Sequence, residues 1–392
     1  MTRLGFAHWL TLPIVAAGLL GACGGGSNDN SATGTLRLSL TDAPACGYDS
    51  VFVTVEKVRV HKSGSATDSD SGWAEVVLAS PQRVDLLTLT NGTLLPLGQT
   101  ALPAGTYTQM RLVLTPNGPR APWPNAITPT GGSETALTTP SGQQSGLKAN
   151  IDITVNPDTV ADFAIDFDAC KSFVRAGNSG QIILKPVLTV IPIVSTSITG
   201  WVDAALDMGK TSVSAQVAGM PVRATPPDAA GRFVLSPVPT GTYNIVITAP
   251  GRANAVMTGV PVAASGPTTI GSSLVRLVPP ASAASAVASG TVSVNGSVLN
   301  TQAAVRALQV LTAGPTIEIG YAGADATTGA YSMTLPTAAP AQVAYAASAA
   351  TFPFSAAPSD AGRYRLEASA PTFAVKTTDV TLPAAPVPFV FP

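Results

Sequence analysis

The sequence has few of the residues that most catalytic sites require. Its 392 residues include 2 histidines and 3 cysteines, and only 11% of the residues are charged. His61 is the one histidine after residue 22, and no GxSxG motif occurs. A single imidazole excludes both a Ser-His-Asp triad of the familiar kind and a multi-histidine metal site. We therefore predict no catalytic, cofactor-binding or metal-binding residues.

The charges are nearly balanced as well as few. The whole sequence has 21 lysines and arginines and 22 aspartates and glutamates, so its formal net charge is −1. Without residues 1–22, which contain Arg3, the balance is 20 minus 22, or −2. A chain with no basic excess has no electrostatic attraction for nucleic acid. We therefore expect no nucleic-acid partner.

The N-terminus has the layout of a secretory signal peptide. Arg3 precedes an apolar run at residues 10–20, which is too short to span a bilayer. The motif Leu20-Gly21-Ala22-Cys23 follows and resembles the bacterial lipobox. The resemblance implies that signal peptidase II removes residues 1–22 and that Cys23 is acylated. The alternative is an ordinary signal peptide with an incidental cysteine.

An acylated Cys23 would make the membrane a partner of this protein. More than one acyl chain gives stable anchoring, and the composition of residues 23–33 is typical of a flexible tether. In lipoproteins of this kind, a residue other than aspartate after the cysteine, here Gly24, implies export to the outer membrane. We therefore expect a lipid-anchored protein of the cell outer membrane that faces the periplasm or the cell surface.

The composition favours β-structure. The sequence has 34 prolines and 36 glycines, and 45% of its residues are hydrophobic. This combination is typical of many short strands separated by turns and not of a disordered chain. Removal of the signal peptide leaves 392 minus 22, or 370, residues, which is more than one core usually covers. We predict an all-β chain of tandem β-sandwiches, Ig-like or transthyretin-like.

Two further cysteines, Cys46 and Cys170, each follow a strand-like run. In an oxidising compartment, one disulfide between them is the simplest prediction. The long loop that it would close gives a stabilisation of roughly 4 to 5 kcal/mol in the chain-entropy model. The alternative is two buried free thiols.

The first domain is expected at residues 34–193. The apolar phase of the run 51–60 shifts near Glu56–Lys57, which predicts a β-bulge. In the later run GQIILKPVLTV, Pro186 predicts an edge or strand-end position for the strand. The phrases SLTDAP, VDLLTL, LPAGTYTQMRL, PSGQQSGLK and LKPVLTV occur in this order. Together they resemble the DUF4382 family of bacterial exported proteins, which is a domain of unknown function.

A second domain is expected at residues 196–277. Its segment GRFVLSPVPTGTYNIVITAPG alternates as two strands of a sandwich hairpin. The positions predicted to face the core are Phe233, Leu235, Tyr243, Ile245 and Ile247. The segment, with Asp228 and Gly231 ahead of its first strand, resembles the carboxypeptidase regulatory-like domain, a transthyretin-like β-sandwich.

The same pattern returns in degraded form after an Ala-Ser-Pro linker at residues 278–287. Tyr364, Leu366 and Ala368 alternate with charged neighbours, as in a half-buried strand. We therefore predict a degenerate second regulatory-like sandwich at residues 288–392. Repetition of this kind indicates architecture before it indicates function.

Several polar features resemble sites but have simpler structural explanations. His61 ends a charged strand face and is interpreted as a solvated edge residue. The run Thr67–Gly72 begins like a calcium loop but lacks the third ligand pair and the terminal glutamate, so we predict a hairpin tip. Asp162, Asp166 and Asp168 could be an acid/base group, but alternation with apolar neighbours predicts that they form the outward face of a strand.

Two classes of function fit these observations. The preferred one is a non-enzymatic binding or structural lipoprotein of the outer membrane, with envelope proteins or glycans as partners and Trp123, between two prolines, as the candidate contact residue. The glycan rests on fold analogy alone. The rival is an envelope enzyme with a carboxylate site at Asp166 and Asp168, an accessory subunit of such an enzyme, or a part of a transport or biogenesis assembly.

Overall fold

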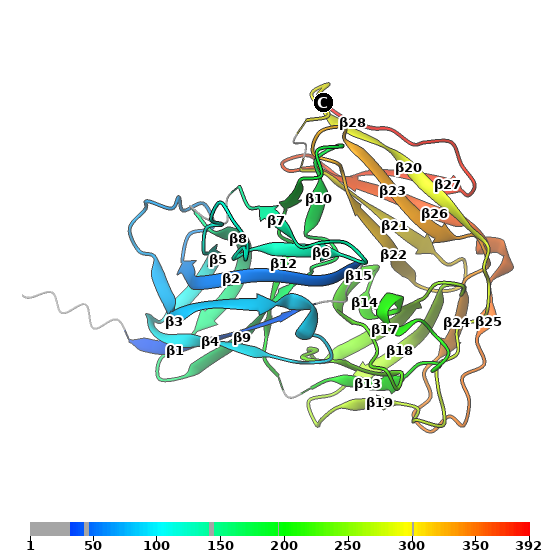
Figure 1. The fold of residues 1–392 in the computed structure, drawn as a ribbon. Coiled ribbons are helices and arrows are strands. Elements are labelled where there is room, and N and C mark those ends of the chain that lie inside the picture. Colours follow the sequence, from blue (N-terminus) through cyan, green and yellow to red (C-terminus); the bar gives the residue numbers. More distant parts are fainter. Residues whose placement is uncertain (1–31, 43–46, 141–144, 195, 300–301) are drawn as a thin grey trace, which may run out of the picture. The chain divides into compact units, whose positions relative to one another are not determined.

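The computed structural model describes residues 32–42, 47–140, 145–194, 196–299 and 302–392 (Figure 1). Within these ranges the regular elements are strands and three short 3-10 turns, and this confirms the prediction of an all-β chain. The turns are η1 (Leu86–Thr88), η2 (Met208–Lys210) and η3 (Pro358–Asp360). No helix of the described residues is long and apolar enough to cross a bilayer. The signal peptide, the lipobox with Cys23, and Cys46 lie outside the described residues.

The first domain has two sheets around one core. One sheet has the order β12-β9-β1-β4, and the other has the order β10-β11-β7-β6-β2-β5-β8, with β3 paired to β2. The strands are β1 (Thr33–Asp42), β2 (Tyr48–His61), β3 (Ala74–Asp85), β4 (Leu95–Pro103), β5 (Gly105–Leu114), β6 (Ala126–Pro129), β7 (Thr135–Thr138), β8 (Leu147–Val155), β9 (Val160–Phe167), β10 (Phe173–Arg175), β11 (Ile182–Leu184) and β12 (Leu188–Pro192). Alternating apolar residues from both sheets, such as Leu38 and Val53, are fully buried between them.

Two local predictions for this domain are confirmed. The register of β2 shifts between Val55 and Lys57 against both β3 and β5, so the β-bulge lies where the apolar phase changes. The bulge lets the valines on either side of it face the same core, and these are Val51, Val53, Val55, Val58 and Val60. Pro186 separates β11 from β12, which lie in different sheets.

The second domain pairs β16-β13-β19 in one sheet and β15-β14-β17-β18 in the other. Its strands are β13 (Ile198–Trp201), β14 (Ser212–Val217), β15 (Met220–Thr225), β16 (Arg232–Leu235), β17 (Gly241–Thr248), β18 (Ala255–Val262) and β19 (Thr268–Ile270). The five predicted inward residues are buried. The predicted hairpin is wrong, because β16 pairs with β13 while β17 pairs with β14 and β18.

The connection at residues 236–240 explains why these two strands separate. Pro237 and Pro239 have no N–H to donate to a ladder. Val238 is fully buried, and its N–H and C=O groups bond the backbone and side chain of Thr196 at 3.1 and 2.6 Å. The segment therefore crosses the core from one sheet to the other.

The third body contains β20 (Ser285–Val294), β21 (Ala304–Val310), β22 (Thr316–Gly323), β23 (Ala330–Pro336), β24 (Ala341–Ala344), β25 (Ser355–Ala356), β26 (Arg363–Ser369), β27 (Lys376–Thr381) and β28 (Phe389–Phe391). Its sheets have the orders β23-β20-β28 and β22-β21-β26-β27. Tyr364, Leu366 and Ala368 are buried, as predicted. The last residues of the predicted linker 278–287 belong to β20 and are therefore strand.

Strand pairing crosses the expected boundary between the second and third bodies. β24 pairs in parallel with β18, and β25 continues the same sheet (Figure 1). Phe352, between these two strands, is buried in the core of the second domain. Residues 32–392 accordingly form one compact unit.

Candidate functional site

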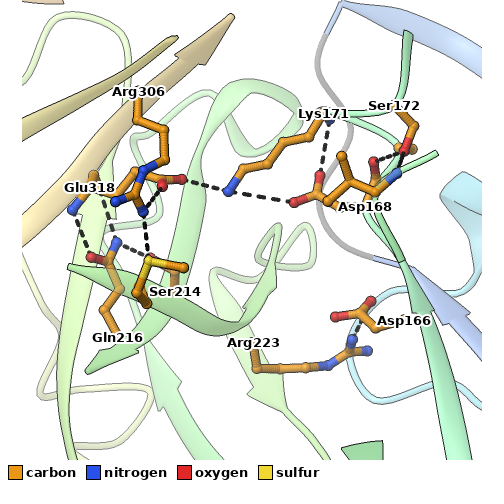
Figure 2. Close-up of polar contacts among 12 residues, drawn as sticks. Asp166, Asp168, Lys171, Ser172, Ser214, Gln216, Arg223, Arg306 and Glu318 are labelled. Atoms are coloured by element: carbon orange, nitrogen blue, oxygen red, sulfur yellow. Dashed lines mark hydrogen bonds and ion pairs between the residues drawn. The ribbon is translucent and has the colours of Figure 1, made fainter. Parts of the chain in front are cut away.

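Asp166, at the end of β9, forms a buried ion pair with Arg223 of β15. An Asp166 oxygen lies 2.5 Å from Nη1 of Arg223, and their side chains are 9% and 1% exposed (Figure 2). Arg223 also donates to Thr41 Oγ1 at 2.5 Å and to the Ser236 carbonyl at 3.1 Å. Nε and Nη2 of Arg223 thus have hydrogen-bond acceptors, while Nη1 and the Asp166 oxygen beside it make an ion pair without hydrogen-bond geometry. A guanidinium can be buried when a carboxylate compensates its charge in this way.

A second charged cluster joins the first domain to the third body (Figure 2). Nζ of Lys171 lies 2.5 Å from Glu318 of β22 and 3.7 Å from Asp168. The second oxygen of Glu318 lies 3.0 Å from Arg306 of β21, which also contacts Glu367 at 2.5 Å. The alternation of charge makes this cluster a continuous network.

Gln216 of β14 adds the second domain to this network. Its side-chain amide donates to the Glu318 carbonyl at 2.9 Å, and its side-chain oxygen accepts from the Glu318 N–H at 2.8 Å. Gln216 is 1% exposed. This paired hydrogen bond holds the backbone of β22 in place, so the carboxylate of Glu318 is fixed between Lys171 and Arg306.

Two cavities adjoin the network and share Lys171 and Tyr321 as lining residues. One has a volume of about 480 Å³, and Asp168, Gln216 and Glu318 also line it. The other has a volume of about 770 Å³, and Lys185 of the β11–β12 connection also lines it. Both volumes are in the range of small-molecule sites.

Burial changes the proton affinity of three groups at these cavities. Desolvation raises the pKa of Asp168 to about 6, against the opposing attraction of Lys171, with a smaller upward effect of Asp166 and Glu318. Desolvation also raises the pKa of Tyr321, and the nearby carboxylates add to that rise. It lowers the pKa of Lys185, which Asp325 partly offsets. Asp168 could therefore hold or release a proton near neutral pH.

The prediction that the three aspartates form the outward face of a strand is wrong for Asp166, and Asp168 lies beyond the end of β9. The side chains of Asp162 and Asp168 are each 21% exposed, and Asp162 pairs with Arg37 of β1. Asp166 is only 7% exposed because Arg223 packs on it, and Asp168 is held beside Lys171. A sequence pattern shows which residues share a face but does not show that another part of the chain covers that face.

His61 and the loop after it form the tip of the β2–β3 hairpin. Nδ1 of His61 accepts from the Ser63 N–H at 2.8 Å, and Nε2 lies 3.0 Å from the Ser71 carbonyl. Asp70 accepts from both the N–H and the hydroxyl of Thr67. These groups therefore bond within the loop, as the hairpin-tip prediction requires.

Trp123 lies in the connection before β6 and is half-buried. Its carbonyl accepts from Nε of Arg83 at 3.1 Å, and Arg83 stacks at 3.6 Å from the centre of the Phe52 ring. The role of Trp123 as a contact residue stays a prediction. The sulfur of Cys170 is disulfide-bonded, but Cys46 is outside the described residues, so the identity of the partner is still a prediction.

Sequence reasoning did not single out Arg223, Glu318 or Lys185. Arg223 lies in the run MPVRAT, where a charged residue next to apolar ones gives no sign of its partner. Glu318 follows Ile317 in β22, and both are buried. Only Arg223 shares its strand parity with a second buried residue, Thr225. Alternation gives no signal for Glu318, which adjoins a buried neighbour, or for Lys185, which lies outside the strands.

Comparisons with known proteins identify part of the chain. Curated proteins give no match. The chain is similar at 12% identity and a TM-score of 0.17 to the Bacillus anthracis TIE protein, covering 92% of this chain and 50% of that one. For a streptococcal ancillary pilin the identity is 11%, the TM-score 0.16 and the coverage 91% and 97%. For a leucine-rich repeat protein from Bacteroides thetaiotaomicron the identity is 11% and the TM-score 0.15, and the match covers 64% of this chain and 26% of that one.

The chain thus spans only half of the Bacillus anthracis protein and about a quarter of the leucine-rich repeat protein. At such TM-scores the likenesses carry no weight for function. Residues 33–186, in contrast, match the family described as "Domain of unknown function (DUF4382)". The order of the five phrases noted in the sequence is consistent with this match. The comparison therefore finds a DUF4382 domain at residues 33–186 of this chain.

Proposed function

We propose that the protein is a non-enzymatic binding lipoprotein of the cell outer membrane, in which a DUF4382 domain and two regulatory-like sandwiches act as one scaffold. The observation that carries the proposal is the use of Asp166, Lys171 and Glu318 in ion pairs between the bodies. Carboxylates held in this way support rigidity. They are poor acid/base catalysts, because each is already paired with a cation.

The anchor in this proposal is Cys23, and a Cys46–Cys170 disulfide would add to the rigidity of the first domain. Acylation of Cys23 is supported by the Leu20-Gly21-Ala22-Cys23 motif. The disulfide-bonded state of Cys170 supports the proposed Cys46–Cys170 disulfide. A rigid body on a short, flexible tether would keep its ligand site close to the membrane, within the reach of the tether.

The test is fatty-acid labelling of the full chain in cells, followed by separation of inner and outer membranes. The unaltered chain is expected to incorporate the label and to fractionate with the outer membrane. Cys23→Ser is expected to lose the label, because the acylated sulfur is gone, while Ser27→Ala, a matched change within the tether, keeps it. A Cys23→Ser chain that remains labelled and membrane-bound would contradict the proposal.

An envelope enzyme is the second candidate, and the raised pKa of Asp168 favours it. A carboxyl group that titrates near pH 6 beside a cavity of about 480 Å³ has the properties of a general acid. We would assay the unaltered chain and Asp168→Asn on panels of glycan and ester substrates, with Asp162→Asn, a change at an equally exposed carboxylate outside the cavity lining, as the matched control. Hydrolysis lost only in Asp168→Asn would support the enzyme and contradict the non-enzymatic role.

A further inference from the structure

The cavity of about 770 Å³ is lined by four cationic side chains, and no carboxylate is among its lining residues. The cations come from four separate positions of the first domain, on β5, on β8 and on either side of β10 and β11. They are Arg111, Lys148, Lys171 and Lys185. Such a concentration of one sign is unusual in a chain in which only 11% of the residues are charged.

Lys171 is the only one of the four with an ion pair in the described part of the chain. Arg111 is 7% exposed and donates to neutral acceptors, which are the side-chain oxygen of Gln109 and the carbonyls of Ala66 and Ser145. Lys148 donates to the carbonyl of Gly64 at 2.8 Å. These bonds satisfy donors without pairing either cation with a carboxylate. The guanidinium of Arg111 also lies 4.9 Å from the centre of the Trp73 ring, and its charge contributes to the lowered pKa of Asp70.

Lys185 is the most unusual of these cations. Its Nζ is buried and has no hydrogen-bond partner among the described residues. The carboxylate whose charge partly offsets the lowered pKa of Lys185 is Asp325, which accepts from the N–H groups of Gly177, Thr327 and Thr328. An ammonium without a partner costs stability, so this position is destabilised in the absence of a ligand.

The rest of the lining is largely apolar. Val174, Ile183, Leu184 and Val187 face the same cavity. The ring of Tyr321 lies on the boundary with the smaller cavity, with Nζ of Lys171 at 5.3 Å from its centre. An occupant would therefore meet cations and an apolar wall together.

We propose that this cavity binds a small organic oxyanion, a carboxylate, sulfate or phosphate carried on an apolar body, with Lys185 as its principal charged contact. The inference rests on the binding role proposed above and names the ligand class. The oxyanion supplies the acceptor that Lys185 lacks, and Arg111 and Lys148 add attraction at longer range. The apolar body replaces water on the valine and leucine side chains.

The test is calorimetric titration of the full chain, purified in detergent, with three probes of similar shape: benzoate, phenyl phosphate and the neutral benzyl alcohol. Benzoate or phenyl phosphate is expected to bind at least about tenfold more tightly than benzyl alcohol, because charge-assisted hydrogen bonds are the stronger kind. Whichever anion binds more tightly identifies the oxyanion. Equal affinity for all three probes, or binding of none, would overturn the proposal.

Variants separate a binding role of Lys185 from a structural one. Lys185→Met is expected to weaken anion binding at least about tenfold and to raise the unfolding temperature of the ligand-free chain, since it removes an unsatisfied charge. Lys185→Arg should retain binding, and Lys376→Met, a change at an exposed lysine of β27, should have no effect. A Lys185→Met chain that binds normally contradicts the proposal.

If Lys185→Met does not fold, Lys148→Met tests the longer-range attraction that the proposal assigns to this exposed lysine, and unchanged anion affinity in that variant would contradict the proposal. Loss of anion binding is measured separately from membrane partition. A chain that is anchored through Cys23 but binds no oxyanion would overturn this inference and leave the proposed lipoprotein role intact. A chain that binds benzoate but is not acylated would give the reverse result.

Discussion

The first domain buries charge in two contrasting ways. At the end of β9, Asp166 has a cation, Arg223, and that cation has further acceptors in Thr41 and Ser236. Beyond β11, the Nζ of Lys185 is buried with no acceptor in the described part of the chain. A satisfied buried charge holds two bodies together, whereas an unsatisfied one lowers stability and leaves a position for a ligand. The two regions therefore suggest a division between support and binding.

The largest effect is expected from removal of the cation in the satisfied pair. Arg223→Met would leave Asp166 buried without a counter-charge, and breaking such a pair typically costs about 3 to 5 kcal/mol of unfolding free energy. Denaturant unfolding of the purified chain measures this loss. The hydrophobic stem of methionine keeps most of the packing, so the loss reports the charge.

The control for this experiment removes both charges. Arg223→Met combined with Asp166→Leu should recover much of the lost stability, because an apolar pair replaces a buried ion pair at little cost. If the single variant unfolds at the same denaturant concentration as the unaltered chain, the pair contributes no support, and the contrast with Lys185 fails.

A smaller, pH-dependent effect is expected at Asp168, because its cation, Lys171, lies 3.7 Å away and compensates its burial only in part. Its pKa in the folded chain is about 6, above the roughly 3.9 of an unfolded aspartate. Between these values the folded state binds more protons than the unfolded state, so stability falls as the pH rises through this window. The unfolding free energy should therefore decrease by about 3 kcal/mol at most between pH 4 and pH 6.

Asp168→Asn removes the group that titrates and should flatten stability between pH 4 and 6. Above pH 6 the variant should be at least as stable as the unaltered chain, although it loses the contact of 3.7 Å to Lys171. Unfolding at a series of pH values checks this, with Asp162→Asn as the control that keeps the slope. A slope that is unchanged in Asp168→Asn would show that its carboxyl group is not the source.

The sequence predicted the strands and the β-bulge well because these depend on local alternation. Residues two positions apart in a strand share a face, and this alternation correctly assigned Val55, Phe233 and Leu366 to a core. The same alternation assigned Asp166 to solvent, because the residues around it in the sequence do not indicate that Arg223 lies opposite. The pairing of β24 with β18 could not be predicted either, because it joins two strands about 85 positions apart in the sequence, and the short β24 has no distinctive pattern.

The candidate site depended even more on distant residues. Arg111, Lys148 and Lys185 are separated by other strands in the sequence, and only the folded chain brings them to one cavity. In the sequence each is an isolated cation of the kind that usually faces solvent. Their positive charges become informative only in the folded chain, where no carboxylate is among the described residues that line the cavity.

The smallest effect is expected for an ion pair that is exposed. Arg365 and Asp379 form two contacts, at 2.7 and 3.1 Å, across β26 and β27, but their side chains are 42% and 71% exposed. Water screens such a pair, so Arg365→Gln should change the unfolding free energy by less than about 1 kcal/mol in the same denaturant assay. A loss as large as that of Arg223→Met would show that contact geometry, and not burial, sets the value of an ion pair in this chain. The distinction between the supporting pair and the open cavity would then need another basis, because it assumes that a charge matters most where water cannot reach it.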